Sequence, residues 1–247
     1  MAPRPTADGQ DVPPLGAATR GAATMATRIH AALREALIHG AIPPGARLHT
    51  RDIGKRYATG LSPVREALSR LSTEGLVRQS DQRGFTAAPL SLADLDELTR
   101  TRCWLNEAAL REAIHRGDAA WEERVALAFF RLSRQPRFLG DADAVRNPAW
   151  DDAHRDFHRS LIAGCDSHWM DGFCDQLFDA FERYRNLTPF NRVTRPNHLD
   201  EHRAIMEAAI ARDGETAARL LRTHFERSET LVRQHMASTQ HEIRPDA

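Results

Sequence analysis

The sequence has few cysteines and no long apolar run. Cysteine occurs at only three of 247 positions, in an odd number and without CxxC spacing, which argues against a disulfide framework or a cysteine-rich zinc site. No apolar segment approaches the roughly 18 residues that suggest a membrane span. The first twenty residues also lack the apolar stretch of a signal peptide. We therefore expect a cytoplasmic protein with no membrane partner.

Motifs of common enzyme classes are missing as well. The sequence contains no GxSxG, no P-loop and no GxGxxG that opens a helix after a strand. Its HRDFH segment differs from HExxH because it has no glutamate at the general-base position of a zinc hydrolase. We therefore expect that the protein is not an enzyme. The alternative is a metal-dependent helical-bundle enzyme with a vestigial winged-helix module.

The charge distribution divides the chain into two parts. The formal net charge is zero, but residues 1–88 hold 12 Lys+Arg against 7 Asp+Glu, whereas residues 89–247 carry a net charge of −5. A basic part beside an acidic part points to a nucleic-acid module joined to a second domain.

The periodicity of residues 23–88 predicts a winged helix-turn-helix. Residues 1–22 are rich in Pro, Gly and Ala without periodicity, which predicts a disordered tail. Helices are expected at about 24–39 and 50–57, and a third begins with Ser62 as N-cap. Two short strands are expected at 76–79 and 85–88.

Beyond Ser91 the strand signals vanish and helical periodicity continues. Ser91 with Asp94 three residues later predicts a helix start. Breaks follow at 117–118, 135–149, 164–167, 189–196 and 213–214. These segments predict roughly six helices in an antiparallel bundle over 91–240, so the whole protein should be mainly α.

The third helix of the first module has the features of a DNA-reading helix. Its N-terminal end can enter a major groove, and Arg65 can reach a guanine edge or a phosphate. Arg51 lies at the start of the preceding helix, and Gly84 at the wing tip permits close approach.

Three segments of this module carry a family resemblance, namely LREALIHGAIPPGARL, SPVREALSRLSTEGLV and RGF. They resemble the DNA-binding domain of the GntR family of bacterial regulators. The resemblance implies DNA contacts at Arg51, Ser62, Arg65 and Gly84. Leu61 departs from the pattern, because the family commonly has a basic residue there, and this departure bears on operator preference.

The second module carries a further resemblance in LTRTRCWLNEAALREAI, HRDFHRSLIAGC and EHRAIMEAAIARDGETAARLLRTHF. It resembles the all-helical FCD effector domain of the FadR-like branch. Within that branch the W-x3-HRDFH and RYRNL segments are most similar to regulators of the glutarate and carbon-starvation type. The resemblance implies effector binding and dimerisation by residues 91–240.

Four histidines of this module form a candidate metal site. His154 and His158 are spaced i, i+4 and share one helix face, while His202 and His224 lie on two later helices. Members of the family often hold a divalent metal with one Asp and three His. His158, His202 and His224 match the three histidines, and His154 occupies the Asp position. An all-histidine set suits zinc or nickel; alternatively, the pocket binds an anionic effector without metal.

A carboxylate effector requires positive donors. By resemblance Arg102 lines the effector pocket, and a guanidinium binds a carboxylate bidentately. Arg155, Tyr184 and Arg185 are further candidates, although Arg185 also fits a surface ion pair.

We therefore expect a homodimeric repressor bound to a pseudo-palindromic double-stranded operator and released by a small carboxylate. An interaction module that dimerises and recruits a partner without any effector is a further alternative.

Overall fold

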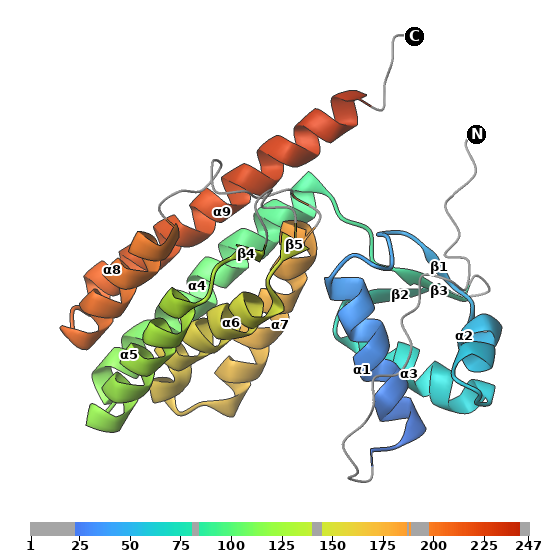
Figure 1. Cartoon of the computed structure of the whole chain (residues 1–247), viewed down its shortest axis with the longest axis horizontal. Coiled ribbons are helices and arrows are strands. Elements are labelled where there is room, and N and C mark those ends of the chain that lie inside the picture. Colours follow the sequence, from blue (N-terminus) through green and yellow to red (C-terminus); the bar gives the residue numbers. More distant parts are fainter. Residues whose placement is uncertain (1–22, 81–83, 140–144, 187, 189–197, 243–247) are drawn as a thin grey trace. The chain divides into compact units, whose positions relative to one another are not determined.

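The computed structural model describes residues 23–80, 84–139, 145–186, 188 and 198–242 (Figure 1). These residues divide into two compact units. The first unit holds the described residues through Asp94 and those from Asp179 to the end of helix α7 (His168–Asn186). The second unit holds the other described residues.

The first unit is a winged helix-turn-helix, as predicted. Its elements are α1 (Met25–Ile38), β1 (Arg47–Leu48), α2 (Thr50–Arg56), α3 (Leu61–Thr73), β2 (Val77–Ser80) and β3 (Gly84–Ala87). The antiparallel sheet has the order β1-β3-β2, so it contains a strand that the periodicity did not predict. Strand β1 is only two residues long and pairs Leu48 with Phe85, which is too short to leave a sequence pattern.

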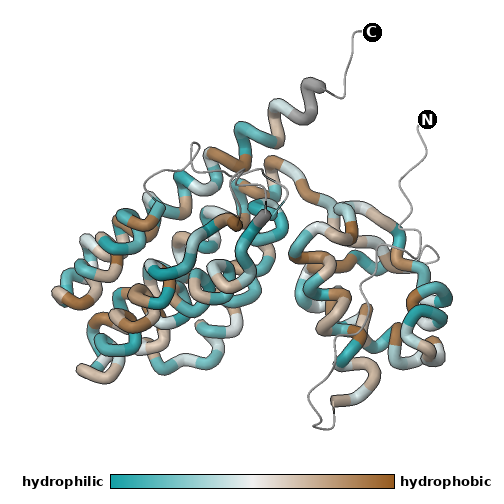
Figure 2. Tube along the Cα trace, viewed as in Figure 1, coloured by the Kyte–Doolittle hydropathy of each residue, from teal (hydrophilic) through white to brown (hydrophobic). Residues whose placement is uncertain are grey.

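The core of this unit lies between α1 and α3. Ile29, Leu33, Leu68 and Leu71 are fully buried there at helical spacing. Figure 2 shows the resulting alternation of apolar and polar positions along the helices. This one-sided burial is what stabilises short helices that are marginal in isolation.

The start of α3 differs from the expectation. The helix begins at Leu61, and Gly60 is its N-cap without a side-chain hydrogen bond. The predicted Ser62 cap is therefore wrong, since Ser62 already lies within the first turn. Pro63 falls in the same turn, where its missing N–H costs no helical hydrogen bond.

The second unit is built from the six helices that the sequence predicts, apart from the first residues of α4 and the last turns of α7, which belong to the first unit. They are α4 (Leu92–Arg116), α5 (Ala119–Arg134), α6 (Pro148–Ile162), α7, α8 (His198–Ile210) and α9 (Gly214–Glu242), with a short 3-10 turn at Ala163–Cys165. The Ser91 hydroxyl accepts from the Asp94 N–H at 3.1 Å, which confirms the predicted start of α4. The prediction that no strands follow Ser91 was wrong, because β4 (Phe138–Leu139) and β5 (Val145–Arg146) pair as antiparallel strands.

Trp121 lies at the centre of the packing in this unit. Its side chain is fully buried, and its Nε1–H donates to the Ser160 carbonyl at 3.0 Å. A Cβ at Gly164 would lie 2.8 Å from the Ala113 carbonyl oxygen and 3.1 Å from Trp121 Cδ1. Only glycine therefore permits this close approach. Within the described residues, no helix is long and apolar enough to cross a membrane.

The last turns of α7, from Asp179 onward, belong to the first unit. Asp179 forms an ion pair with Arg34 of α1. Arg183 is buried and donates to the Ala88 carbonyl at 2.5 Å. One helix thus contributes residues to both units.

Candidate functional site

A hollow of about 540 Å³ opens in the first unit between the sheet and α3. It brings together two of the predicted DNA-contacting residues, Arg65 of α3 and Gly84 of β3. Arg47, Ser69 and Gln79 also line it. The hollow therefore combines two arginines with neutral hydrogen-bonding groups, which suits a phosphate backbone and base edges.

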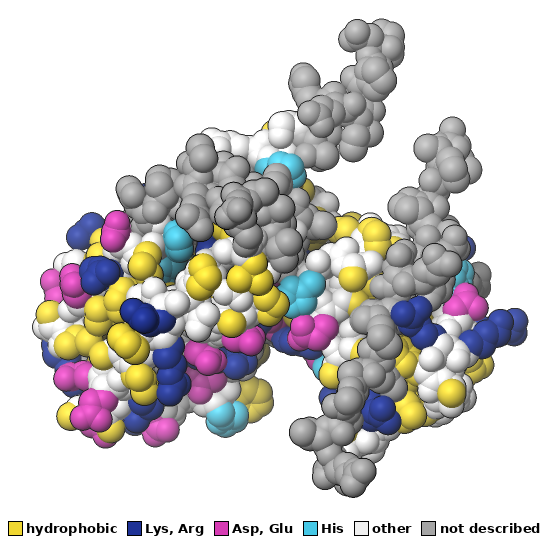
Figure 3. All heavy atoms as spheres, viewed as in Figure 1, with side chains coloured by type: hydrophobic (Ala, Val, Ile, Leu, Met, Phe, Trp, Pro, Cys, Tyr) yellow, Lys and Arg dark blue, Asp and Glu magenta, His cyan; other side chains and the backbone are white. Residues whose placement is uncertain are grey.

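The other two predicted DNA residues lie at helix starts. Arg51 is in the first turn of α2 and Ser62 in the first turn of α3, and both are exposed. Exposed side chains at the N-terminal end of a helix face its positive dipole end, so both positions suit phosphate contacts. Figure 3 shows exposed Lys and Arg side chains on this unit in dark blue.

The backbone conformation at position 84 favours glycine, in addition to the close approach to DNA that a missing side chain permits. Its φ is +77°, a conformation that residues with a side chain rarely adopt, and open space surrounds the position of a Cβ. Leu61 is 43% exposed at the first position of α3. It presents an apolar side chain at the position where the resemblance implies a basic residue.

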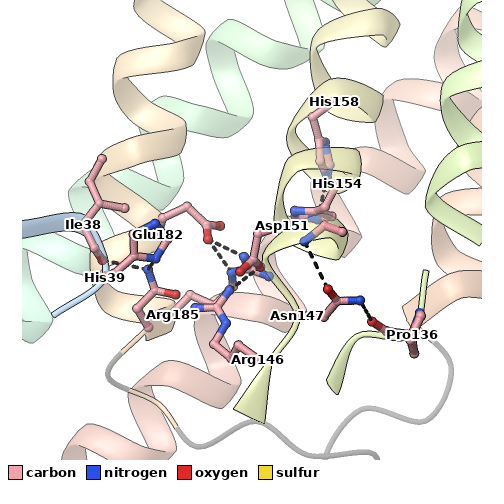
Figure 4. A network of polar contacts seen from close by, with 12 residues as sticks. Ile38, His39, Pro136, Arg146, Asn147, Asp151, His154, His158, Glu182 and Arg185 are labelled. Atoms are coloured by element: carbon pink, nitrogen blue, oxygen red, sulfur yellow. Dashed lines mark hydrogen bonds and ion pairs between the residues drawn. The ribbon is translucent and has the colours of Figure 1, made fainter. Parts of the chain in front are cut away.

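The second unit assembles the four predicted histidines into one buried cluster. One ligand nitrogen from each of His154, His158, His202 and His224 lies within 4.8 Å of the others. The Nε2 atoms of His154 and His158 are 3.2 Å apart across one turn of α6 (Figure 4). His202 on α8 and His224 on α9 are 1% and 4% exposed. Three helices therefore converge on one point.

Two groups outside the cluster, the His198 carbonyl and the Glu201 carboxylate, contact the Nδ1 atoms of His202 and His224. The sequence analysis did not predict either contact. His202 Nδ1 lies 2.6 Å from the His198 carbonyl oxygen. His224 Nδ1 lies 2.9 Å from a carboxylate oxygen of Glu201. Glu201 is 23 residues from His224, so no local pattern signals the contact.

Aromatic side chains surround the cluster. Trp150 is buried and stacks on His154 with ring centroids 4.6 Å apart and planes at 14°. Phe178 lies 5.7 Å from His154 and 6.0 Å from His158 by ring centroids. Phe225 contacts His158 at 5.8 Å. This apolar wall keeps the imidazoles in a low-dielectric setting.

Two predicted effector residues lie against this aromatic wall. The buried Arg102 places its guanidinium carbon 4.1 Å from the centre of the Phe225 ring. The half-buried Arg155 lies 4.4 Å from the centre of Phe178. Each cation is thus one aromatic ring away from the histidines.

The other two predicted effector residues have contacts in the first unit. The Tyr184 hydroxyl donates to Asp94 at 2.5 Å. Burial, and then this hydrogen bond, raise the pKa of Tyr184, so its hydroxyl stays protonated. Arg185 forms a buried ion pair with Glu182 on the same helix (Figure 4). Both positions remain predictions as effector contacts.

Comparison with known proteins agrees with the geometry of both units. Residues 25–86 match the model of the bacterial regulatory proteins of the gntR family, and residues 97–227 match the FCD domain. The chain is 41% identical over 207 residues to the uncharacterized HTH-type transcriptional regulator BphR of Paraburkholderia xenovorans, covering 82% of each chain. It is 32% identical over 209 residues to the HTH-type transcriptional repressor GlaR of Escherichia coli, covering 83% of this chain and 94% of that one.

A solved structure shows the same fold. The chain aligns with E. coli McbR/YncC at a TM-score of 0.71 and 20% identity, covering 86% of this chain and 99% of that one. These matches, together with the winged helix, define a DNA-binding transcriptional regulator rather than an enzyme. The chain belongs to the GntR family and carries an FCD domain as its second unit.

Proposed function

We propose that this chain is a homodimeric repressor that leaves its operator when a small carboxylate binds the second unit. The observation that carries the proposal is the cluster of four buried histidines inside the FCD domain of a DNA-binding chain. The relative GlaR is named a repressor, which supports the direction of regulation.

The histidine cluster fits a divalent transition metal. All four donors are imidazole nitrogens, which suit zinc or nickel better than magnesium or calcium. The 3.2 Å between the facing nitrogens of His154 and His158 is close to the edge of about 3.3 Å expected for a tetrahedral site with metal–nitrogen bonds of about 2.05 Å. Such an ion would supply a Lewis acid, and it would accept a carboxylate oxygen only by expanding its coordination beyond the four imidazoles.

The residues of this chain add positive charge beside that position. Imidazole ligands are neutral, so His154 contributes no negative charge where the family has Asp. Arg102 and Arg155 each lie one aromatic ring away from the cluster. A small anion in the bundle is therefore favoured electrostatically, since opposing charges attract strongly in a dry interior.

DNA binding follows from the first unit. Two copies related by a two-fold axis present two α3 helices to successive major grooves, which matches a pseudo-palindromic operator. An acid that binds the non-operator conformation more tightly shifts the population away from DNA by its difference in affinity for the two conformations.

The test uses the untagged, full-length chain purified without chelator. Its metal content is measured by elemental analysis, and its operator is selected from random duplexes. Operator binding is then titrated with mono- and dicarboxylates before and after removal of metal. His202→Ala is the site variant, and His115→Ala, an exposed histidine of α4, is the matched control.

Each outcome separates one part of the proposal. Near-stoichiometric zinc or nickel, with an acid that raises the melting temperature and releases the operator, supports it fully. Release by the acid from metal-free protein overturns the metal part and assigns the acid to the histidines and Arg102 directly. A selection without a preferred sequence overturns operator recognition. No response to any acid favours a module that recruits a partner without effector.

A further inference from the structure

The first turn of α8 holds a carboxylate directly behind the histidine cluster. The side chain of Glu201 is only 14% exposed. One of its oxygens lies 2.9 Å from His224 Nδ1, and the other lies 3.1 Å from the Arg227 guanidinium. Since His224 and Arg227 are on α9, this carboxylate joins α8 to α9 at the cluster.

The chemistry of the two contacts determines which ring nitrogen faces the cluster. A carboxylate only accepts hydrogen bonds, so His224 Nδ1 is the donor and carries the hydrogen. The neutral ring then has its lone pair on Nε2. The carbonyl of His198 acts in the same way on His202 Nδ1 at 2.6 Å. His154 and His158 already face each other through Nε2, so all four rings can present the same atom.

Glu201 differs from the His198 carbonyl because it adds charge. The four candidate ligands are all imidazoles, so the ligand set itself holds no carboxylate. A carboxylate behind a ligating imidazole raises the basicity of that ring and favours a bound cation. The carboxylate of Glu201 thus places a negative charge directly behind the His224 ring.

We propose that Glu201 is a positioning residue of this metal site, which orients His224 and supplies, from outside the ligand set, a negative charge that the four imidazoles lack. The inference rests on the proposed metal-binding function. What it adds is that a carboxylate on α8, which is not itself a ligand, supports the four histidine ligands.

Two variants separate orientation from charge. In Glu201→Gln the amide oxygen still accepts from His224 Nδ1, but the charge is gone. In Glu201→Ala both the acceptor and the charge are lost. Glu207→Gln removes an exposed carboxylate from the same helix and is the matched control.

The experiment uses the full chain after metal removal, with zinc alone and cobalt(II) alone as probes. Loss of an outer partner typically weakens metal affinity by ~10–100-fold, and we expect Glu201→Ala to fall in this range. Glu201→Gln should lose less, and Glu207→Gln should remain within about twofold of the wild type, since it touches no ligand. The cobalt absorption bands should shift in Glu201→Ala, because His224 is no longer held through Nδ1.

The melting temperature of the metal-free variants serves as the control for a merely structural role. A structural contact would lower that temperature while leaving zinc affinity and the cobalt spectrum unchanged. That result, in a wild-type chain that binds zinc, would overturn the role of Glu201 and leave the metal site standing. A wild-type chain that binds neither zinc nor cobalt would overturn the metal site itself.

Discussion

Replacing Arg65 with alanine should weaken operator binding severely without harming the fold. Arg65 is exposed on α3 and lines the hollow together with Gly84. The residues of the same helix that form the core, such as Leu68, point to the other side and are untouched. The substitution therefore removes a guanidinium from the candidate DNA face and leaves the packing of α1 against α3 intact.

The magnitude follows from the kind of contact. A bidentate arginine–guanine pair is worth ~1–3 kcal/mol, which is about 5- to 150-fold in affinity per half-site. A dimer on two half-sites loses the contact twice, so the expected total is ~2–6 kcal/mol. If Arg65 contacts a phosphate instead, affinity should fall for every duplex alike, and the salt dependence should decrease by about one charge per half-site.

The assay is operator binding at several salt concentrations, with an unrelated duplex alongside. Arg70→Ala is the matched control, because Arg70 lies further along the same helix and its guanidinium is 3.3 Å from the Thr27 hydroxyl of α1. We expect this control to bind the operator nearly as the wild type does. Wild-type affinity of Arg65→Ala, or an equal loss in Arg70→Ala, would refute the docking of α3 by this face.

Three further predictions concern the second unit. His202→Ala should abolish zinc binding and release by the acid while basal operator binding persists; release at the wild-type acid concentration would contradict it. Gly164→Ala should lower the melting temperature by a few degrees, since its Cβ would lie 2.8 Å from a backbone oxygen and overpacking costs ~1–3 kcal/mol; an unchanged melting temperature would show that the contact relaxes. Burial raises the pKa of Cys103 to about 11 and of Cys174 to about 12 from an ordinary 9.0. The stability that these neutral thiols contribute is present below pH 9 and is lost as the pH rises toward 12, so the melting temperature should fall in that window, and less in a chain with alanine at both positions.

Local signals in the sequence were sufficient for most of the helices. The apolar spacing of Ile29 and Leu33, and the Ser91 cap of α4, act within one or two turns and are readable from the residues alone. Strand β1 and the hairpin β4–β5 were missed because two-residue strands carry no periodicity. The cap of α3 was misplaced because Gly60 acts through its backbone, with no side chain to signal it.

The residues of the candidate sites likewise divide into those that local spacing predicts and those that only the packing of helices brings together. Arg65 and the i, i+4 pair His154 and His158 were predictable, since helical spacing determines which side chains share a face. The carboxylate of Glu201 behind His224 was not predictable, because the contact joins two helices.

The sequence by itself determined the family, the winged helix, the six-helix second unit and the identity of the candidate histidines, because these depend on motifs and local periodicity. Only the tertiary structure decided that α6, α8 and α9 bring one nitrogen from each of four imidazoles within 4.8 Å of the others. It also decided that Arg102 lies against Phe225, whose ring contacts His158, and that Glu201 lies behind His224. These contacts arise when separate helices bury their apolar faces together. That packing brings distant residues together without leaving a trace in the local pattern of either helix.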